Sequence, residues 1–211
     1  MDADGGGAGA GPAEVLAAHL RGLLAARGVP VVAGIDGRSG CGKSTLAAAV
    51  AARLARPGRQ VTVIDGDDFY TGGSAAQWDA RTAAESSARV IDWRAQRRVL
   101  TELGQAGVAT WHPFDWDAEE WDGESAPLAP RRTARAAPVI ILDGAYSCRP
   151  ELHDLLDLRV LLQVPDELRR ARLRRREADD YQADWEARWQ GAEDHYFTAV
   201  MPPARFDLVI G

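Results

Sequence analysis

The stretch VVAGIDGRSGCGKSTLAAAVAARLA, residues 31–55, decides the fold of this chain. Residues 31–35 form an unbroken apolar run that is typical of a buried β-strand, and residues 44–55 have the pattern of a helix. The turn between them fits G-x-x-x-x-G-K-[ST], in which backbone N–H groups converge on phosphate oxygens at a helix N-terminus. Because strand, loop and helix follow in the order that this pattern requires, the sequence predicts a nucleotide-binding loop.

Lys43 is the only lysine in the chain, which uses arginine for every other strong cation. A compact ammonium on a flexible stem can reach the β- and γ-phosphates where a planar guanidinium would not fit. The Ser44 hydroxyl is a candidate Mg²⁺ ligand. ATP and Mg²⁺ are therefore the expected cofactors. The residues expected to hold the nucleotide are Gly37, Arg38, Ser39, Gly40, Cys41, Gly42, Lys43, Ser44 and Thr45.

Length and charge limit the class of protein. With 211 residues we expect a single domain over residues 13–211, preceded by a disordered tail at residues 1–12. The net charge of −6 disfavours a nucleic-acid partner, and no apolar stretch is long enough to span a membrane. Cys41 and Cys148 have no metal-site spacing and fit a reducing cytoplasm, with a disulfide between them left open.

Four further apolar runs have the composition of strands. They are unbroken rather than alternating, as strands buried on both faces of a parallel sheet are. Helical segments separate them, so we expect an α/β fold of about five parallel strands flanked by helices. The four runs are residues 61–65, 138–143, 158–164 and 206–210.

The connection over residues 66–137 is unusually long, and such a connection in a compact domain is usually functional. It leaves the carboxyl end of a strand, where ligands of open α/β sheets gather. We therefore expect residues 71–135 to be a substrate-binding insertion, with a helix near residues 88–105. Its tryptophans either pack in the core or stack on a planar substrate group. They are Trp78, Trp93, Trp111, Trp116 and Trp121.

Acidic residues follow two of the predicted strands. Asp67 and Asp68 stand in the segment GDDFY after residues 61–65, and Asp143 ends the run 138–143. Phosphoryl transfer needs a group that orients the attacking hydroxyl and accepts its proton, and a metal ion that neutralises phosphate charge. The aspartate pair is a candidate for the base or for a metal ligand, or else it caps a turn. Asp143 is a candidate Mg²⁺ ligand.

An arginine-rich helix, DELRRARLRRRE, is expected at residues 166–177. Its residues Arg169, Arg172 and Arg176 fall on one face. A solvated basic face would explain this run, and so would a lid whose arginines close over a transferring phosphate. We favour a lid over residues 166–180.

Together these segments resemble the uridine kinase and phosphoribulokinase group of P-loop kinases. The resemblance covers most of residues 31–211 and rests on GIDGRSGCGKST, DDFY, IDW, HPFDW, LDGAYS and the arginine helix. It implies a P-loop kinase fold in which Lys43 is catalytic, Asp67 is the catalytic base and a metal ligand, and Arg172 and Arg176 are lid arginines.

The same resemblance implies an acceptor site built from Asp68, Tyr70, Asp92, Phe114, Asp115 and Trp116. Uridine kinases carry Tyr-Asp-Phe and then a histidine that helps to hold the pyrimidine. This chain has Phe114-Asp115-Trp116, with Glu119 near the place of the histidine. Uridine is therefore expected to be a poor acceptor. Two further departures are a shortened lid signature, Arg176-Glu177, and an aspartate at position 143 where glutamate is common.

The function predicted from the sequence is ATP-dependent phosphorylation of a hydroxyl on a small molecule. The alternatives are a phosphotransferase of specialised metabolism with a non-nucleoside acceptor and a regulatory nucleotide-binding ATPase. A protein kinase is disfavoured because the chain has no asparagine to supply the metal ligand of that class. The acceptor, the choice between ATP and GTP, and a homo-oligomeric state are left open.

Overall fold

The structure is a computed structural model that describes residues 10–27, 30–55, 60–118, 126–177 and 183–211. Five parallel strands form the main sheet in the order β2-β5-β1-β6-β7, which confirms the expected α/β fold. The central strand β1 pairs with β5 and β6, with Val31 opposite Val139 and Ala33 opposite Leu158. The strands are β1 Val31–Asp36, β2 Val61–Asp65, β5 Val139–Asp143, β6 Leu158–Leu162 and β7 Leu208–Ile210.

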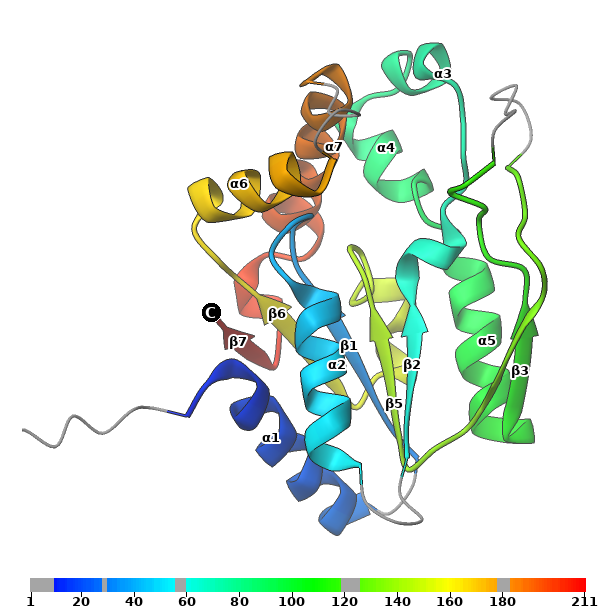
Figure 1. Cartoon of the computed structure of the whole chain (residues 1–211), viewed down its shortest axis with the longest axis vertical. Helices are drawn as coiled ribbons and strands as arrows, with labels where there is room; N and C mark the ends of the chain where they lie inside the picture. Colours follow the sequence, from blue (N-terminus) through cyan, green and yellow to red (C-terminus); the bar gives the residue numbers. More distant parts are fainter. Residues whose placement is uncertain (1–9, 28–29, 56–59, 119–125, 178–182) are drawn as a thin grey trace, which may run out of the picture.

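Helices cover both faces of this sheet (Figure 1). Helices α1 (Pro12–Arg27) and α2 (Lys43–Leu54) pack on the face that carries Val31, Ala33 and Ile35. The opposite face carries Val32 and Ile140 and packs against a second core that includes α5 (Trp93–Ala106). Alternate residues of a strand thus enter different cores, which explains why the strand sequences are apolar without interruption.

The insertion folds into more elements than the sequence predicted. The helix expected near residues 88–105 is wrong at its start, because Asp92 Oδ1 accepts the N–H groups of Arg94 and Ala95 and so begins α5 at Trp93. Two short helices and an antiparallel strand pair were not predicted. The elements before and after α5 are a 3₁₀ turn η1 Gly66–Phe69, α3 Ala75–Asp79, α4 Ala83–Arg89, β3 Val108–Trp111 and β4 Arg132–Arg135.

The C-terminal third of the chain holds the predicted arginine-rich helix α6 (Asp166–Glu177); residues 178–180 of the expected lid lie outside the described residues. Helix α7 (Ala183–His195) continues into a π-helical turn, Tyr196–Val200. The remaining turns are the 3₁₀ segments η2 Pro150–Leu155 and η5 Pro203–Arg205.

Two other expectations concern membrane-spanning helices and the cysteines. In the part of the protein that the structure describes, no helix has the length and apolar character needed to cross a bilayer. Cys41 and Cys148 are both buried and free, so the disulfide that the sequence left open is not formed.

Candidate active site

The predicted phosphate loop lies between β1 and the first residue of α2. Gly42 ends the loop with φ +100°, a left-handed conformation that favours glycine. The Nζ of Lys43 donates hydrogen bonds to the carbonyl oxygens of Gly37 at 2.8 Å and Arg38 at 3.3 Å. Burial by itself lowers the pKa of Lys43, but acidic neighbours that include Asp67 outweigh it and the pKa is raised. The loop therefore holds a firmly charged ammonium.

Strands β2 and β5 bring the predicted acidic residues to this loop, because they are neighbours in the sheet and Asp65 lies opposite Asp143. Burial raises the pKa of Asp143 to about 6, although a hydrogen bond with the Ser44 hydroxyl lowers it in part. The charge of Asp67 acts on both Asp143 and Lys43. The Oδ1 atom of Asp143 is buried and has no hydrogen-bond partner among the described residues.

The two aspartates of GDDFY have different surroundings. Asp68 is buried and accepts hydrogen bonds from Trp111 Nε1 at 2.7 Å and from Arg132 Nη1 at 2.7 Å. Burial raises the pKa of Asp68, and these two donors offset part of the rise. Asp67 is exposed, and its backbone N–H donates to Asp65 Oδ1 at the start of η1. Asp68 thus anchors the insertion, whereas Asp67 is exposed and its charge acts on Lys43 and Asp143.

Helix α6 contacts the loop through its arginines. Arg172 Nη1 donates to the carbonyl oxygen of Cys41 at 2.9 Å. Arg169 is buried, and its Nη1 donates to the carbonyl oxygen of Ser39 at 3.2 Å. The side chain of Arg176 lies outside the described part of the chain. The structure therefore brings one of the two predicted lid arginines to the loop and adds Arg169.

Helix α7 also holds the loop, through residues that sequence reasoning missed. Glu193 is buried, and its Oε1 accepts hydrogen bonds from the backbone N–H and the hydroxyl of Ser39, at 2.7 and 2.6 Å. The next residue, Asp194, forms an ion pair with Arg38 at 2.5 Å. Both contacts join segments far apart in the sequence, so no local pattern could have indicated them.

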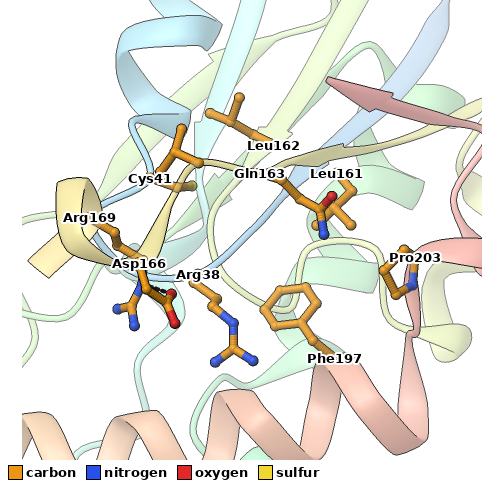
Figure 2. A pocket seen from close by; sticks show the side chains of 10 residues that line it. Arg38, Cys41, Leu161, Leu162, Gln163, Asp166, Arg169, Phe197 and Pro203 are labelled. Carbon is orange, nitrogen blue, oxygen red and sulfur yellow. Dashed lines mark hydrogen bonds and ion pairs between the residues drawn. The ribbon is translucent and has the colours of Figure 1, made fainter. Parts of the chain in front are cut away.

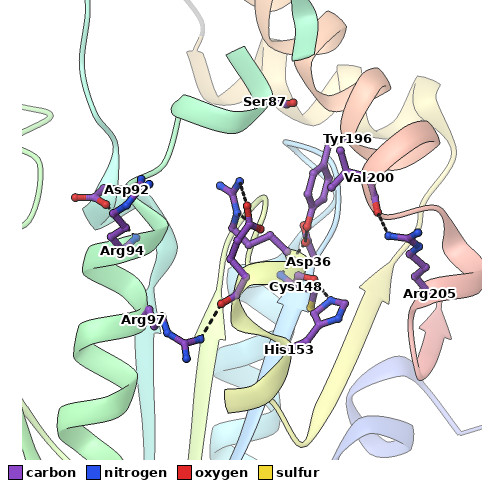
Figure 3. A network of polar contacts seen from close by, with 12 residues as sticks. Asp36, Ser87, Asp92, Arg94, Arg97, Cys148, His153, Tyr196, Val200 and Arg205 are labelled. Atoms are coloured by element: carbon purple, nitrogen blue, oxygen red, sulfur yellow. Dashed lines mark hydrogen bonds and ion pairs between the residues drawn. The ribbon is translucent and has the colours of Figure 1, made fainter. Parts of the chain in front are cut away.

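Asp36, the last residue of β1, is completely buried and is the centre of a polar network (Figure 3). Its carboxylate accepts hydrogen bonds from the backbone N–H groups of Gly37, Tyr146 and Cys148, at 2.8 to 2.9 Å, and from the Tyr196 hydroxyl at 2.8 Å. Burial raises its pKa to about 6, against the lowering effect of these bonds. In the sequence, the signal for this network was an acid at the end of an otherwise apolar strand.

A cavity of about 500 Å³ borders the outer side of the loop (Figure 2). It is formed by the loop, the end of β6, the start of α6 and the segment after α7. Phe197 and Arg38 lie beside each other there, with the guanidinium 5.5 Å from the ring centre. The lining residues are Arg38, Cys41, Leu161, Leu162, Gln163, Val164, Asp166, Arg169, Phe197 and Pro203.

The residues predicted to line an acceptor site gather around Tyr70. Phe114 packs edge-on against this buried ring at a centroid distance of 4.8 Å, and Trp116 stacks on it at 5.0 Å. Asp92 caps α5, and Asp115 Oδ1 accepts the N–H of Asp117 in a turn. The structure brings the aromatic residues together and gives both aspartates a local structural contact.

The tryptophans of the insertion divide between the two expected roles. Trp78 and Trp111 are buried, as core residues are, and Trp93 is half-buried. Trp116 is 57% exposed and is the one described tryptophan that presents a large open ring face. Trp121 lies outside the described residues.

Known proteins match both the sequence and this arrangement. The AAA domain family matches residues 34–195. The uridine kinase of Leuconostoc citreum (strain KM20) is 28% identical over 182 residues, which cover 82% of this chain and 79% of that protein.

Among solved structures, a possible uridine kinase from Bacillus stearothermophilus superposes with a TM-score of 0.68 at 22% identity, covering 95% of this chain and 97% of its own. Phosphoribulokinase from Rhodobacter spheroides gives a TM-score of 0.54 at 16% identity, covering 84% and 68%. The structural matches establish the shared fold. The chain belongs to the AAA domain family and is related there to the uridine kinase and phosphoribulokinase group of P-loop kinases.

Proposed function

We propose that this protein transfers the γ-phosphate of ATP to a hydroxyl group of a small molecule, with Asp67 as the base. The observation that carries the proposal is the meeting of three strand ends: Lys43 after β1, Asp67 after β2 and Asp143 at the end of β5. Phosphoryl transfer requires a cation on the phosphates, a metal-binding acid and a group for the acceptor proton, and this meeting supplies all three.

The nucleotide site of this proposal extends from the loop into the cavity in Figure 2. The loop N–H groups and Lys43 would hold the phosphates of ATP. The cavity beside Arg38 and Phe197 would hold its adenine ring. An aromatic ring and a guanidinium both offer stacking faces to a planar heterocycle. Arg172, already on the loop at Cys41, would move a short way to reach the phosphates.

The residues near Ser44 fit a magnesium ion. The buried, unpartnered Oδ1 of Asp143 could ligate Mg²⁺ or accept a hydrogen bond from a water bound to it, and Ser44 lies against the same carboxylate. A cavity of about 440 Å³ opens beside Ser44, Asp65 and Asp143 and gives room for hydration. The ion, when bound, would neutralise charge on the β- and γ-phosphates.

Asp67 suits the role of base better than Asp68. The Asp68 carboxylate is buried and accepts hydrogen bonds from Trp111 and Arg132, whereas Asp67 is exposed and lies close enough to Lys43 for its charge to raise the pKa of Lys43. In this position Asp67 would accept the proton of the acceptor hydroxyl as the oxygen attacks the γ-phosphorus. The insertion at residues 71–135 would hold the rest of the acceptor, next to Tyr70 and Trp116. We place the enzyme in the cytoplasm, where its free cysteines stay reduced.

The test is a screen for ADP release over nucleosides, sugars, amino compounds and organic acids, with mass detection of the phosphorylated product. Lys43→Ala is the control, since it removes the phosphate cation. A product whose formation requires both ATP and Lys43 supports the proposal. ADP release that never depends on an added acceptor would instead identify a nucleotide-binding ATPase.

A further inference from the structure

A cavity of about 460 Å³ lies within the insertion, close along the chain to the proposed base. It is open to solvent and is lined by residues 71–73, by the ends of α3 and α4 and by the first turn of α5. Three arginines line it: Arg81, Arg89 and Arg94. Asp92, which caps α5, and Trp93 also line this cavity.

Two of these guanidinium groups are held in place by tryptophan rings. The Cζ atom of Arg81 lies 4.1 Å from the ring centre of Trp78, and that of Arg94 lies 4.3 Å from the ring centre of Trp93. Stacking fixes the plane of a guanidinium and leaves its N–H edge available for a carboxylate or phosphate oxygen. The cost in side-chain entropy of binding an anion is thereby reduced.

The backbone beside the cavity is built around this stack. Gly73 has φ +121°, and a Cβ atom there would lie 2.8 Å from Trp78 Nε1, so only glycine permits the approach. The Nη1 atom of Arg81 is buried and has no hydrogen-bond partner among the described residues. A buried N–H donor without a partner is costly, and a bound oxygen would satisfy it.

The charge of the cavity favours an anion. In the described part of the chain, none of the three arginines has a carboxylate within 4.0 Å, although many other arginines form such pairs. The one acid in the lining is Asp92, and its Oδ1 is engaged by the N–H groups that begin α5. Outside the lining, hydrogen bonds from Thr82 and, less strongly, the charges of Arg89 and Arg81 lower the pKa of Glu85. Within the lining the arginines still outnumber the acid by three to one.

The edge of the cavity is close to Asp67 along the chain. Thr71, at its edge, follows Asp67 by four residues, most of them in the 3₁₀ turn η1, which advances about 2 Å per residue. The separation along the backbone is therefore on the order of 10 Å, the length of a small phosphorylated or carboxylated polyol.

We propose that the phosphate acceptor is itself an anion, whose phosphate or carboxylate group binds to Arg81, Arg89 and Arg94 while its hydroxyl lies at Asp67. This inference rests on the proposed kinase function. It names a charged small molecule, and not a neutral nucleoside, as the class of acceptor.

The first test compares matched acceptors in the ADP-release assay: neutral sugars and polyols, their monophosphates, and the corresponding sugar acids. We expect turnover with one charged set, and the identity of that set separates phosphate from carboxylate. Arg81→Gln should raise the Michaelis constant of the charged acceptor by about tenfold or more, because a charged hydrogen bond is lost, and leave that of ATP unchanged. Arg53→Gln is the matched control, since Arg53 is exposed on α2 and paired with Glu14, away from the cavity.

Neutral acceptors used as well as charged ones, with no effect of Arg81→Gln, would overturn the inference and leave the kinase function standing. A second test needs no acceptor. Inorganic phosphate is titrated into the Lys43→Ala protein, in which the phosphate loop is disabled, and tryptophan fluorescence is followed because Trp78 and Trp93 lie under the arginines. We expect a saturable change that Arg81→Gln removes.

Absence of a saturable change with millimolar phosphate, and likewise with the sugar acids of the first test, would also overturn the inference, even if no acceptor were found. The relation to the acceptor is decided by inhibition kinetics. Phosphate that competes with the acceptor supports one shared site. Phosphate that inhibits without competing would show a separate anion site and contradict the assignment to the acceptor.

Discussion

Replacing Asp36 by asparagine should change how the stability of this protein depends on pH. The wild-type carboxylate is completely buried, and burial raises its pKa from 3.8 to about 6. A folded-state pKa above the unfolded value means that the folded protein binds this proton more tightly. The contribution of the protonated form to stability is therefore complete below pH 3.8 and is lost as the pH rises through about 6.

The size of this effect follows from the shift. A rise of roughly 2 pKa units, at about 1.4 kcal/mol each, corresponds to about 3 kcal/mol of unfolding free energy. Asparagine does not titrate, so Asp36→Asn removes this pH dependence. The NH₂ of its amide group would also face the backbone N–H of Cys148 or of Tyr146, so that two donors oppose each other. Leaving this buried N–H without an acceptor costs about 1–3 kcal/mol of stability at every pH.

The assay is urea unfolding of both proteins at steps between pH 4 and pH 7.5, followed by circular dichroism. We expect the variant to be clearly less stable at pH 4 and the difference to shrink by about 2.4 kcal/mol by pH 7, since part of the effect lies below pH 4. Taking the difference between the two proteins cancels the titration of Asp143, whose pKa is also raised to about 6. A difference that stays constant with pH would refute the reasoning, because Asp36 would then titrate alike in the folded and unfolded chains.

Substitutions of Lys43, of the aspartate pair and of Glu193 test the active site. Lys43→Ala should abolish phosphoryl transfer, and Lys43→Arg should impair it strongly, because a planar guanidinium cannot replace the compact charge of an ammonium. The thermal unfolding temperature should change little in both variants. Near-normal kcat in either variant would contradict the catalytic role of Lys43. Asp67→Asn should lower kcat much more than ATP affinity. Asp68→Asn should instead cost about 1–3 kcal/mol of stability, because the carboxylate that pairs with Arg132 and accepts the Trp111 N–H is replaced by a neutral amide. The reverse pattern would exchange the two roles. The Glu193→Gln protein should still accept a hydrogen bond from Ser39, because its amide keeps an acceptor oxygen. Its ATP affinity, measured by calorimetry, should lie between those of the wild type and of Glu193→Ala. Equal affinities in all three proteins would show that Glu193 does not support the nucleotide site.

The main sheet and the phosphate loop could be predicted from the sequence because their signals are local. Each strand is one apolar run, and the loop pattern fixes the turn, the helix start and the place of Lys43 within a few neighbouring residues. Asp67 and Asp143 could be placed because strand ends of a parallel sheet meet at one edge.

The packing of the insertion and the side chains that hold the phosphate loop in place could not be predicted, because their contacts connect distant segments. The capping boxes at Ser74 and Thr82 were a local signal for the starts of α3 and α4, whereas the packing of α4 against α7 joins distant segments. Glu193 and Tyr196 reach the loop only after the whole chain has folded. A helical pattern shows which residues share a face, but it does not show which loop that face will contact.

The strand order has a consequence for the way this protein is made. β1 is synthesised before its two neighbours, which begin only at Val139 and Leu158. This apolar strand therefore lacks its partners until those residues are added, and during that period the nascent chain is exposed to aggregation and accessible to chaperones. Tyr196, which holds the end of β1 through Asp36, is added later still. Nucleotide binding should accordingly appear late and abruptly in synthesis, once the last third of the chain is available.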